Sequence, residues 1–315
     1  MPAALIPSAQ AATKDRAIGL TLALFGAVAF SGKAIIVKLA YRYGVDAVTL
    51  IMYRMLFALP LFATMAWWAS RGKAALTRGD WLGVLGLGFS GYYLASFLDF
   101  AGLAYITASL ERLILYLNPT VVLLMGRVLY GRGVRAGQLL GMAVSYSGVV
   151  LVFGQEAVHQ GTGTAWGALL VLGSAVSYAV YLVYSGELVK RLGSLRLVGL
   201  ATTVACLLCL LQFVVLRPLS AALVAPQVVW LSVLNATLCT AVPVLMVMMA
   251  IERIGASAAS QAGMVGPMAT ILMGVWLLGE PFTAGVALGT ALVICGIFVF
   301  SRASRASRTS RVPAR

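Results

Sequence analysis

Five charged side chains lie inside long apolar stretches of this sequence, where an ionised group needs a partner. They are Lys33, Arg54, Asp99, Glu111 and Arg112. A charge left alone at the centre of a lipid bilayer costs at least about 2.5–3.5 kcal/mol, so such residues pair with one another, bind a charged molecule or carry a proton. Long cationic side chains have an alternative, because their stems can reach the membrane surface.

Reaching the surface is the simpler expectation for Lys33, and it stays open for Arg112. For Arg54, Asp99 and Glu111 we expect a polar network that faces a cavity. The residues expected to act in gating or in coupling are Lys33, Arg54, Glu111 and Arg112.

Polar and aromatic side chains recur at helical spacing in the apolar stretches, within residues 92–99, 111–118, 174–181 and 257–264. One such stripe alone is more often a helix-packing surface than a site. Four stripes that converge would line a polar, aromatic cavity, which suits a small substrate with an apolar side chain and a charged end. The expected substrate contacts are Tyr92, Ser96, Asp99, Asn118, Tyr178, Tyr181 and Gln261.

Few residues of this chain suit metal or redox chemistry. His159 is the only histidine, and the Cys206-x-x-Cys209 pair falls in an apolar run, so we expect it to pack a helix. The chain has no H-E-x-x-H motif and no paired-Asp motif, so we expect no enzyme activity, no metal and no cofactor. Nothing resembles the selectivity filter or charged ring of a channel.

The composition shows which elements must position these residues. Of the 315 residues, 61% are hydrophobic and only 10% are charged, too few charges to cover a soluble surface. The apolar residues come in blocks of about 20, the length of a helix that crosses a bilayer, without the alternation of a barrel. We expect an all-α membrane protein with ten spans, at 17–39, 46–69, 80–103, 106–130, 135–154, 165–188, 196–216, 228–251, 255–278 and 283–301.

Lysine and arginine orient these spans. With the N-terminus inside, sixteen cations fall in inner connections and chain ends, against three outside, Lys38, Arg42 and Arg217. The positive-inside rule then places both termini in the cytoplasm, and we expect a multi-pass protein of the bacterial inner membrane. Residues 1–16 lack the pattern of a cleavable signal peptide. The net charge of +14 follows from the same distribution, so the expected partners are lipid and a small-molecule substrate, not nucleic acid, and we expect a monomer.

The sequence repeats itself at an offset of 148 residues, which aligns 106–148 with 254–296 without a gap. Each half holds five spans, an odd number, so the second half must cross the membrane in the opposite sense. Inverted repeats of this kind are typical of secondary transporters, whose sites lie near the midplane. The expected units are a cytoplasmic segment 1–16, a repeat 17–154, an external linker 155–164, a repeat 165–301 and a basic cytoplasmic tail 302–315.

Prolines and glycines recur at equivalent positions of the two halves. Pro119 and Pro267 each remove a backbone donor, so we expect them to act as hinges at the cavity wall, with an inert kink as the alternative. Small residues four apart permit close contact between helices, so we expect spans five and ten to form a scaffold. Its packing positions are Gly137, Gly141, Gly285 and Gly289.

The paired prolines of "YLNP" and "MVGP", the five-plus-five spans and the "LLGEP" after span nine resemble the drug/metabolite transporter superfamily, specifically its EamA-type members. The resemblance covers nearly the whole chain, which looks most like amino-acid exporters of the YddG type. It implies export of aromatic or neutral amino acids by alternating access. Export or import of another small metabolite or drug is the alternative. The repeat partner of Glu280 is Arg132, so no universal role is assigned to Glu280, although Asp99, Glu111 and Glu280 are each able to carry a proton.

Overall fold

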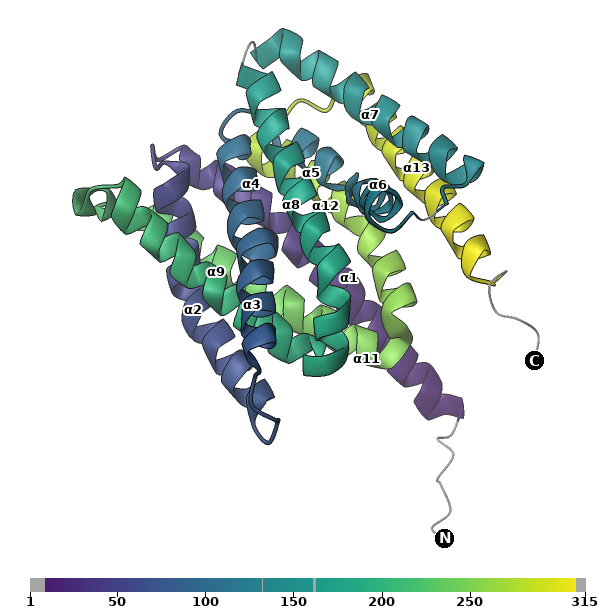
Figure 1. Cartoon of the computed structure of the whole chain (residues 1–315). Helices are drawn as coiled ribbons and strands as arrows, with labels where there is room; N and C mark the ends of the chain where they lie inside the picture. The colour runs from purple at the N-terminus through teal and green to yellow at the C-terminus, as the bar shows by residue number, and fades with distance from the viewer. Residues whose placement is uncertain (1–8, 132, 161–162, 310–315) are drawn as a thin grey trace.

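The computed structural model describes residues 9–131, 133–160 and 163–309, and every element in those ranges is a helix (Figure 1). The first repeat contains α1 (Ala9–Tyr41), α2 (Ala47–Ser70), α3 (Arg78–Leu87), the π-helix η1 (Gly88–Leu94), α4 (Ala95–Leu103), α5 (Ala108–Leu115), α6 (Asn118–Tyr130) and α7 (Ala136–Gln160). The second contains α8 (Gly163–Leu192), α9 (Ser194–Leu216), the 3-10 helix η2 (Leu219–Ala222), α10 (Pro226–Ala236), the π-helix η3 (Thr237–Ala241), α11 (Val242–Ala262), the 3-10 helix η4 (Gly263–Val265), α12 (Gly266–Met273), the π-helix η5 (Gly274–Leu278) and α13 (Ala284–Thr309).

Within the described ranges, nine helices are long and apolar enough to cross a membrane, and Gly266–Leu278 is a shorter apolar helix in the ninth predicted span. The expected all-α membrane fold is confirmed. The predicted break between spans eight and nine is wrong, because α11 continues across it from Val242 to Ala262. The residues there include no proline and are compatible with a helix, so α11 ends only before Gly263.

The packing of the helices follows a two-fold relation between the repeats. α7 packs against α13, α2 against α9 and α5 against α12, and each of these pairs joins equivalent spans. α1 packs against α11 of span eight, while its equivalent, α8, packs against α4 of span three. Exchanging the two halves therefore leaves each of the first three contacts unchanged and converts the α1–α11 contact into the α8–α4 contact. The interface between the repeats runs through the middle of the bundle.

α7 and α13 lie side by side at one edge of the bundle (Figure 1). A Cβ atom at Gly141 would lie 2.6 Å from the Gly296 carbonyl oxygen, and one at Gly148 would lie 2.5 Å from the Gly289 carbonyl oxygen. Side chains larger than hydrogen cannot fit where two backbones approach so closely. The two helices therefore pack through glycine at these positions.

The other two predicted packing glycines are less constrained. A Cβ atom at Gly137 would lie 3.0 Å from the Cβ atom of Ala303. A Cβ atom at Gly285 would meet the amide end of the Gln155 side chain, which accepts a hydrogen bond from Thr283 Oγ1 at 2.8 Å. Of the four positions, Gly141 and Gly289 thus lie against backbone, and Gly137 and Gly285 lie against side chains.

Replacing Gly141 with alanine should destabilise the α7–α13 pair by about 1–3 kcal/mol, because the new methyl would lie 2.6 Å from the Phe300 nitrogen. Gly154→Ala is a matched control on α7, since apart from the adjoining backbone of α7 no atom of the described residues lies within 4 Å of its Cβ position. Alanine there should favour the helix by about 0.5–1 kcal/mol. Thermal unfolding of both variants in detergent measures the difference, and equal unfolding temperatures would contradict the need for close contact.

Candidate functional site

Spans four and nine are each broken into two helices. α5 ends at Leu115 and α6 begins at Asn118, while η4 separates α11 from α12. Pro119 and Pro267 lie in the first turn of α6 and of α12, where a missing N–H removes no helical hydrogen bond. The breaks thus differ in form from the kinks predicted within continuous helices, because each helix is interrupted before its proline and restarts there.

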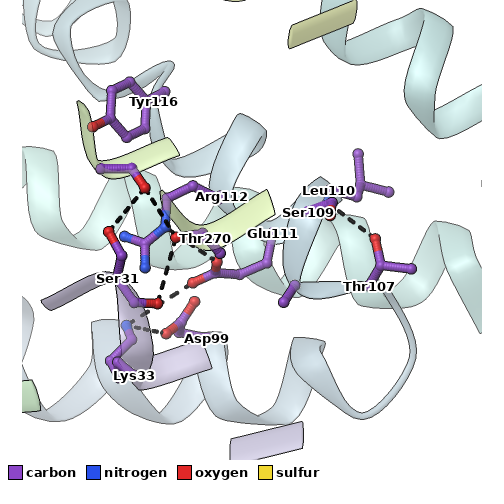
Figure 2. A network of polar contacts seen from close by, with 12 residues as sticks. Ser31, Lys33, Asp99, Thr107, Ser109, Leu110, Glu111, Arg112, Tyr116 and Thr270 are labelled. Atoms are coloured by element: carbon purple, nitrogen blue, oxygen red, sulfur yellow. Dashed lines mark hydrogen bonds and ion pairs between the residues drawn. The ribbon is translucent and has the colours of Figure 1, made fainter. Parts of the chain in front are cut away.

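Side chains of the first repeat hold the backbone where span nine is broken (Figure 2). Ser31 Oγ donates to the Gly266 carbonyl oxygen at 2.8 Å. Tyr116 OH donates to the Gly263 carbonyl oxygen at 3.0 Å. Thr270 Oγ1 donates to the Gly266 carbonyl at 3.2 Å and to the Ser31 carbonyl at 3.4 Å. A break inside a membrane is tolerated where neighbours satisfy the backbone in this way.

Four of the five predicted charges meet beside this break (Figure 2). Lys33 Nζ lies 2.5 Å from Asp99 Oδ2 and 4.0 Å from Glu111 Oε1. Arg112 Nε lies 3.8 Å from Glu111 Oε2. The Lys33–Asp99 contact is a hydrogen-bonded ion pair, whereas both contacts of Glu111 are too long for hydrogen bonds. The cluster joins α1, α4 and α5 and holds Glu111 only loosely.

The expectation that Lys33 reaches the membrane surface is wrong. Lys33 is 7% exposed, and Arg112, for which the same alternative was open, is 4% exposed. The Phe30 ring lies 5.7 Å from Lys33 Nζ and 5.9 Å from the Arg112 guanidinium carbon. Asp99 of α4 pairs with Lys33 in the interior, and the Phe30 ring lies near both cations. Among the described residues, Arg112 forms only the loose ion-pair contact with Glu111 on its own helix.

Arg54 lies in the same interior but contacts the second repeat. Its Nε and Nη2 donate to Thr240 Oγ1 at 3.3 and 3.2 Å, and its guanidinium lies 5.1 Å from the Phe100 ring. Asn235 Nδ2, also from span eight, donates to the Lys33 carbonyl oxygen at 3.4 Å. Span eight therefore encloses the charged cluster from the side of the second repeat.

π-Helices interrupt spans three and eight at equivalent positions. η1 precedes α4, which carries Asp99, and η3 carries Thr240. Thr240 Oγ1 donates to the Asn235 carbonyl oxygen at 2.8 Å, and Ser177 Oγ of α8 donates to the Ser90 carbonyl oxygen of η1 at 2.7 Å. π-Helical turns are frequent at functional sites. Nothing in the residue pattern predicts them, because their side chains are those of an ordinary apolar helix.

The cluster has more hydrogen-bonding capacity than its members use. Among the described residues, no hydrogen-bond partner contacts either carboxylate oxygen of Glu111, Nε and Nη2 of Arg112, Nη1 of Arg54 or Oδ1 of Asp99. With Lys33, the set holds three cations and two carboxylates, so their ordinary charges sum to +1. Buried polar groups are normally hydrogen-bonded, so a polar molecule bound here would supply the partners that these atoms lack.

The predicted tyrosines form an aromatic group between spans three and six. Tyr92 OH and Tyr181 OH lie 3.2 Å apart, and the rings of Tyr178 and Tyr181 stack with centroids 5.5 Å apart. The serine part of the same stripe joins helices instead, because Ser174 Oγ donates to the Ala95 carbonyl oxygen at 2.7 Å. One polar stripe thus combines a packing surface with an aromatic surface.

The remaining predicted contacts lie at different depths along the site. Ser96 is half-buried on α4, one turn before Asp99. Asn118 is half-buried at the break in span four, and its Oδ1 has no hydrogen-bond partner in the part of the chain that the structure describes. The side chain of Gln261 lies outside the described residues.

Glu280 has a structural role that the sequence reasoning missed. Its Oε1 accepts a hydrogen bond from Ala108 N at 2.7 Å, and its Oε2 accepts from Ser109 Oγ at 2.7 Å. Glu156 accepts from Thr107 N at 3.1 Å at the same helix end. Carboxylates are favoured there because the first N–H groups of a helix are free and carry partial positive charge. The "LLGEP" motif was the signal that could have led to this contact.

Two further hydrogen bonds lie at this end of the bundle, one between the repeats and one within the first repeat. Arg42 Nη2 of the first repeat donates to the Leu278 carbonyl oxygen of the second at 2.7 Å. Lys38 Nζ donates to the Ile106 carbonyl oxygen at 3.0 Å, which ties α1 to the connection before α5. Together with the cap that Glu280 provides, these bonds connect α1, α5 and the second repeat at the end where α5 begins.

Comparison with known proteins gives a consistent result over most of the chain. The EamA-like transporter family matches residues 17–154 and 165–302, one segment in each repeat. The uncharacterized transporter YcbK of Bacillus subtilis (strain 168) is 29% identical over 278 residues, which cover 86% of this chain and 88% of that protein. The uncharacterized transporter YoaV of the same organism is 23% identical over 216 residues, covering 69% and 72%. A protein crystal structure matches with a TM-score of 0.58 at 20% identity, over 93% of this chain and 98% of that one, which indicates a shared fold.

Proposed function

Because the chain belongs to the EamA-like transporter family, we propose that it exports amino acids with aromatic or neutral side chains across the cytoplasmic membrane by alternating access. Family membership makes the protein a membrane transporter of small molecules. The resemblance to amino-acid exporters of the YddG type supports the substrate class and the direction.

The observation that carries the proposal is the buried charged cluster beside the broken spans. Glu111 and Arg112 present opposite charges from consecutive positions, and both are at most 4% exposed. A small zwitterion has both charges that such a pair would match. The tyrosine group around Tyr181 offers an aromatic surface for the side chain of the same molecule. Broken helices near the interface between inverted repeats are where transporters bind their substrates.

Alternating access requires that the two ends of the bundle open in turn. The bonds of Glu280 and Arg42 connect the two repeats at the end where α5 begins. The distribution of lysine and arginine supports an outer position for that end. If the two repeats exchange packings about their two-fold axis, this end opens while the opposite end closes, and the charged cluster is exposed to each side in turn.

Uptake into proteoliposomes with a panel of amino acids, with and without a pH gradient, tests the proposal. We expect saturable uptake of aromatic or neutral amino acids. A response to the gradient would assign a proton to the cycle, and its absence would indicate facilitated diffusion. Uptake of other metabolites or drugs with none of the panel would contradict the amino-acid class.

We expect both chain termini to lie in the cytoplasm, from the distribution of lysine and arginine. Cysteines placed at Tyr43 and Lys73, both exposed in connections between spans, report on opposite sides of the membrane. In a background without the native cysteines, an impermeant maleimide added to whole cells should label position 43 and leave position 73 unlabelled. The reverse labelling pattern would contradict the assigned orientation.

A further inference from the structure

Arg112 presents an open pair of hydrogen-bond donors inside the protein. Among the residues that the structure describes, its Nε and Nη2 have no hydrogen-bond partner, although the side chain is only 4% exposed. These two N–H groups lie on the same edge of the guanidinium, and that edge binds a carboxylate through two parallel hydrogen bonds. An arginine in a membrane interior has a high cost unless such a partner is supplied.

The protein's own carboxylates do not fill this role. Arg112 Nε lies 3.8 Å from Glu111 Oε2, which is too far for a hydrogen bond. Asp99 is engaged by Lys33 at 2.5 Å. Arg54, the other arginine of the cluster, differs, because its Nε and Nη2 both donate to Thr240 Oγ1. Arg112 is therefore the cation of the cluster whose carboxylate-binding edge stays available.

Glu111 offers the complementary half of the same arrangement. The side chain is fully buried beside the Asp99 carboxyl group, and neither of its oxygens accepts a hydrogen bond from a cation of the cluster. Lys33 Nζ is 4.0 Å from Oε1, beyond hydrogen-bond distance, so Lys33 leaves this oxygen free to accept from an ammonium group that approaches from another side. Two adjacent residues thus leave two donors and two acceptors unused.

We propose that Arg112 binds the carboxylate of the substrate through Nε and Nη2, and that Glu111 binds its ammonium group, so that the site recognises the zwitterionic part of an α-amino acid. The inference deepens the proposed function and rests on it. A zwitterion adds no net charge to the cluster, and it supplies both partners that the pair lacks. The loose contact between Glu111 and Arg112 opens to admit the substrate and re-forms after release.

Binding measurements on the purified protein test this assignment separately from transport. The probes are phenylalanine, phenylalaninamide, which lacks the carboxylate, and 3-phenylpropionate, which lacks the ammonium group. Calorimetry on the wild type should show binding of phenylalanine and a loss of at least about tenfold for each analogue. Arg112→Gln should weaken phenylalanine binding by a similar factor, and Arg112→Lys should not restore it fully, because a lysine cannot bind a carboxylate through two fixed donors.

The variants are designed to separate recognition from folding. Glu111→Gln should reduce the preference for phenylalanine over 3-phenylpropionate and leave the preference over the amide intact. The double variant Glu111→Gln/Arg112→Gln removes both charges, so it should stay folded by size exclusion and fail to bind. Arg127→Gln, an exposed cation of the same span, is the matched control and should bind as the wild type does.

Three results would overturn the inference. They are equal binding of phenylalanine and its amide, wild-type binding by a folded Arg112→Gln variant, and binding of no probe by the wild type. Selective binding of phenylalanine without uptake into proteoliposomes would instead contradict the proposed function and leave the recognition site standing.

Discussion

Asp99→Asn should destabilise the folded protein by about 3–5 kcal/mol, the cost of removing one partner from a buried ion pair. The substitution leaves Lys33, which is 7% exposed, without the carboxylate that lies 2.5 Å from its Nζ. Glu111→Gln should cost much less, because the contacts of Glu111 are 3.8 and 4.0 Å long. Thermal unfolding of the detergent-solubilised variants measures both effects.

Two comparisons make this prediction specific. Lys33→Gln combined with Asp99→Asn removes both charges, so it should recover much of the lost stability without restoring transport. Glu187→Gln breaks an ion pair with Lys190 whose side chains are 82% and 74% exposed, and a surface pair of this kind contributes little. If Asp99→Asn unfolds at the same temperature as the wild type, the buried pair is not structural, and the charges have another arrangement in the membrane.

Pro119→Ala and Pro267→Ala should slow transport more than they weaken substrate binding. A proline inside a helix costs about 3 kcal/mol relative to alanine, so each proline disfavours the continuous helix that would join the two parts of its span. Alanine removes that barrier and shifts the population towards the continuous form by up to about a hundredfold. A span that no longer bends at its break should exchange more slowly between the two open states.

Pro60→Ala is the matched control for the hinge prediction. Pro60 lies inside the continuous helix α2 and faces outward, away from either break. Uptake rates and calorimetric binding constants for the three variants separate turnover from binding. Unchanged turnover in both Pro119→Ala and Pro267→Ala would mean that the breaks are passive features of packing.

The residue pattern predicts the helical fold because its signals are local. Blocks of apolar residues have the length of a membrane-crossing helix, and the gapless repeat relates Pro119 to Pro267 whatever their surroundings. The boundary at the end of span eight could not be predicted, because Glu252 and Arg253 mark the edge of an apolar block without ending a helix. The end of an apolar stretch indicates where the chain leaves the lipid. The helix ends where its backbone hydrogen bonds stop, and that residue can be a different one.

The candidate site could be predicted only as a set of charges at similar depth. That Lys33 pairs with Asp99 depends on how α1 and α4 rotate about their axes, which packing between distant spans decides. The assignment of Lys33 to the membrane surface failed for this reason. The contact of Glu280 with α5 joins residues far apart in the sequence, since Ala108 and Glu280 are separated by 172 positions. The periodicity of residues within one helix carries no information about such a contact.

Locking the end of the bundle where α5 begins tests whether the two repeats alternate in opening to the two sides of the membrane. Ser109 Oγ and Glu280 Oε2 lie 2.7 Å apart across the repeat interface, so cysteines at both positions, in a background without the native cysteines, can be bridged by a short bis-methanethiosulfonate reagent. Each single-cysteine variant controls for modification alone. Bridging should abolish uptake and a reductant should restore it, because the end where α5 begins must open in every cycle. Uptake by the bridged protein at the unbridged rate would contradict alternating access through this interface.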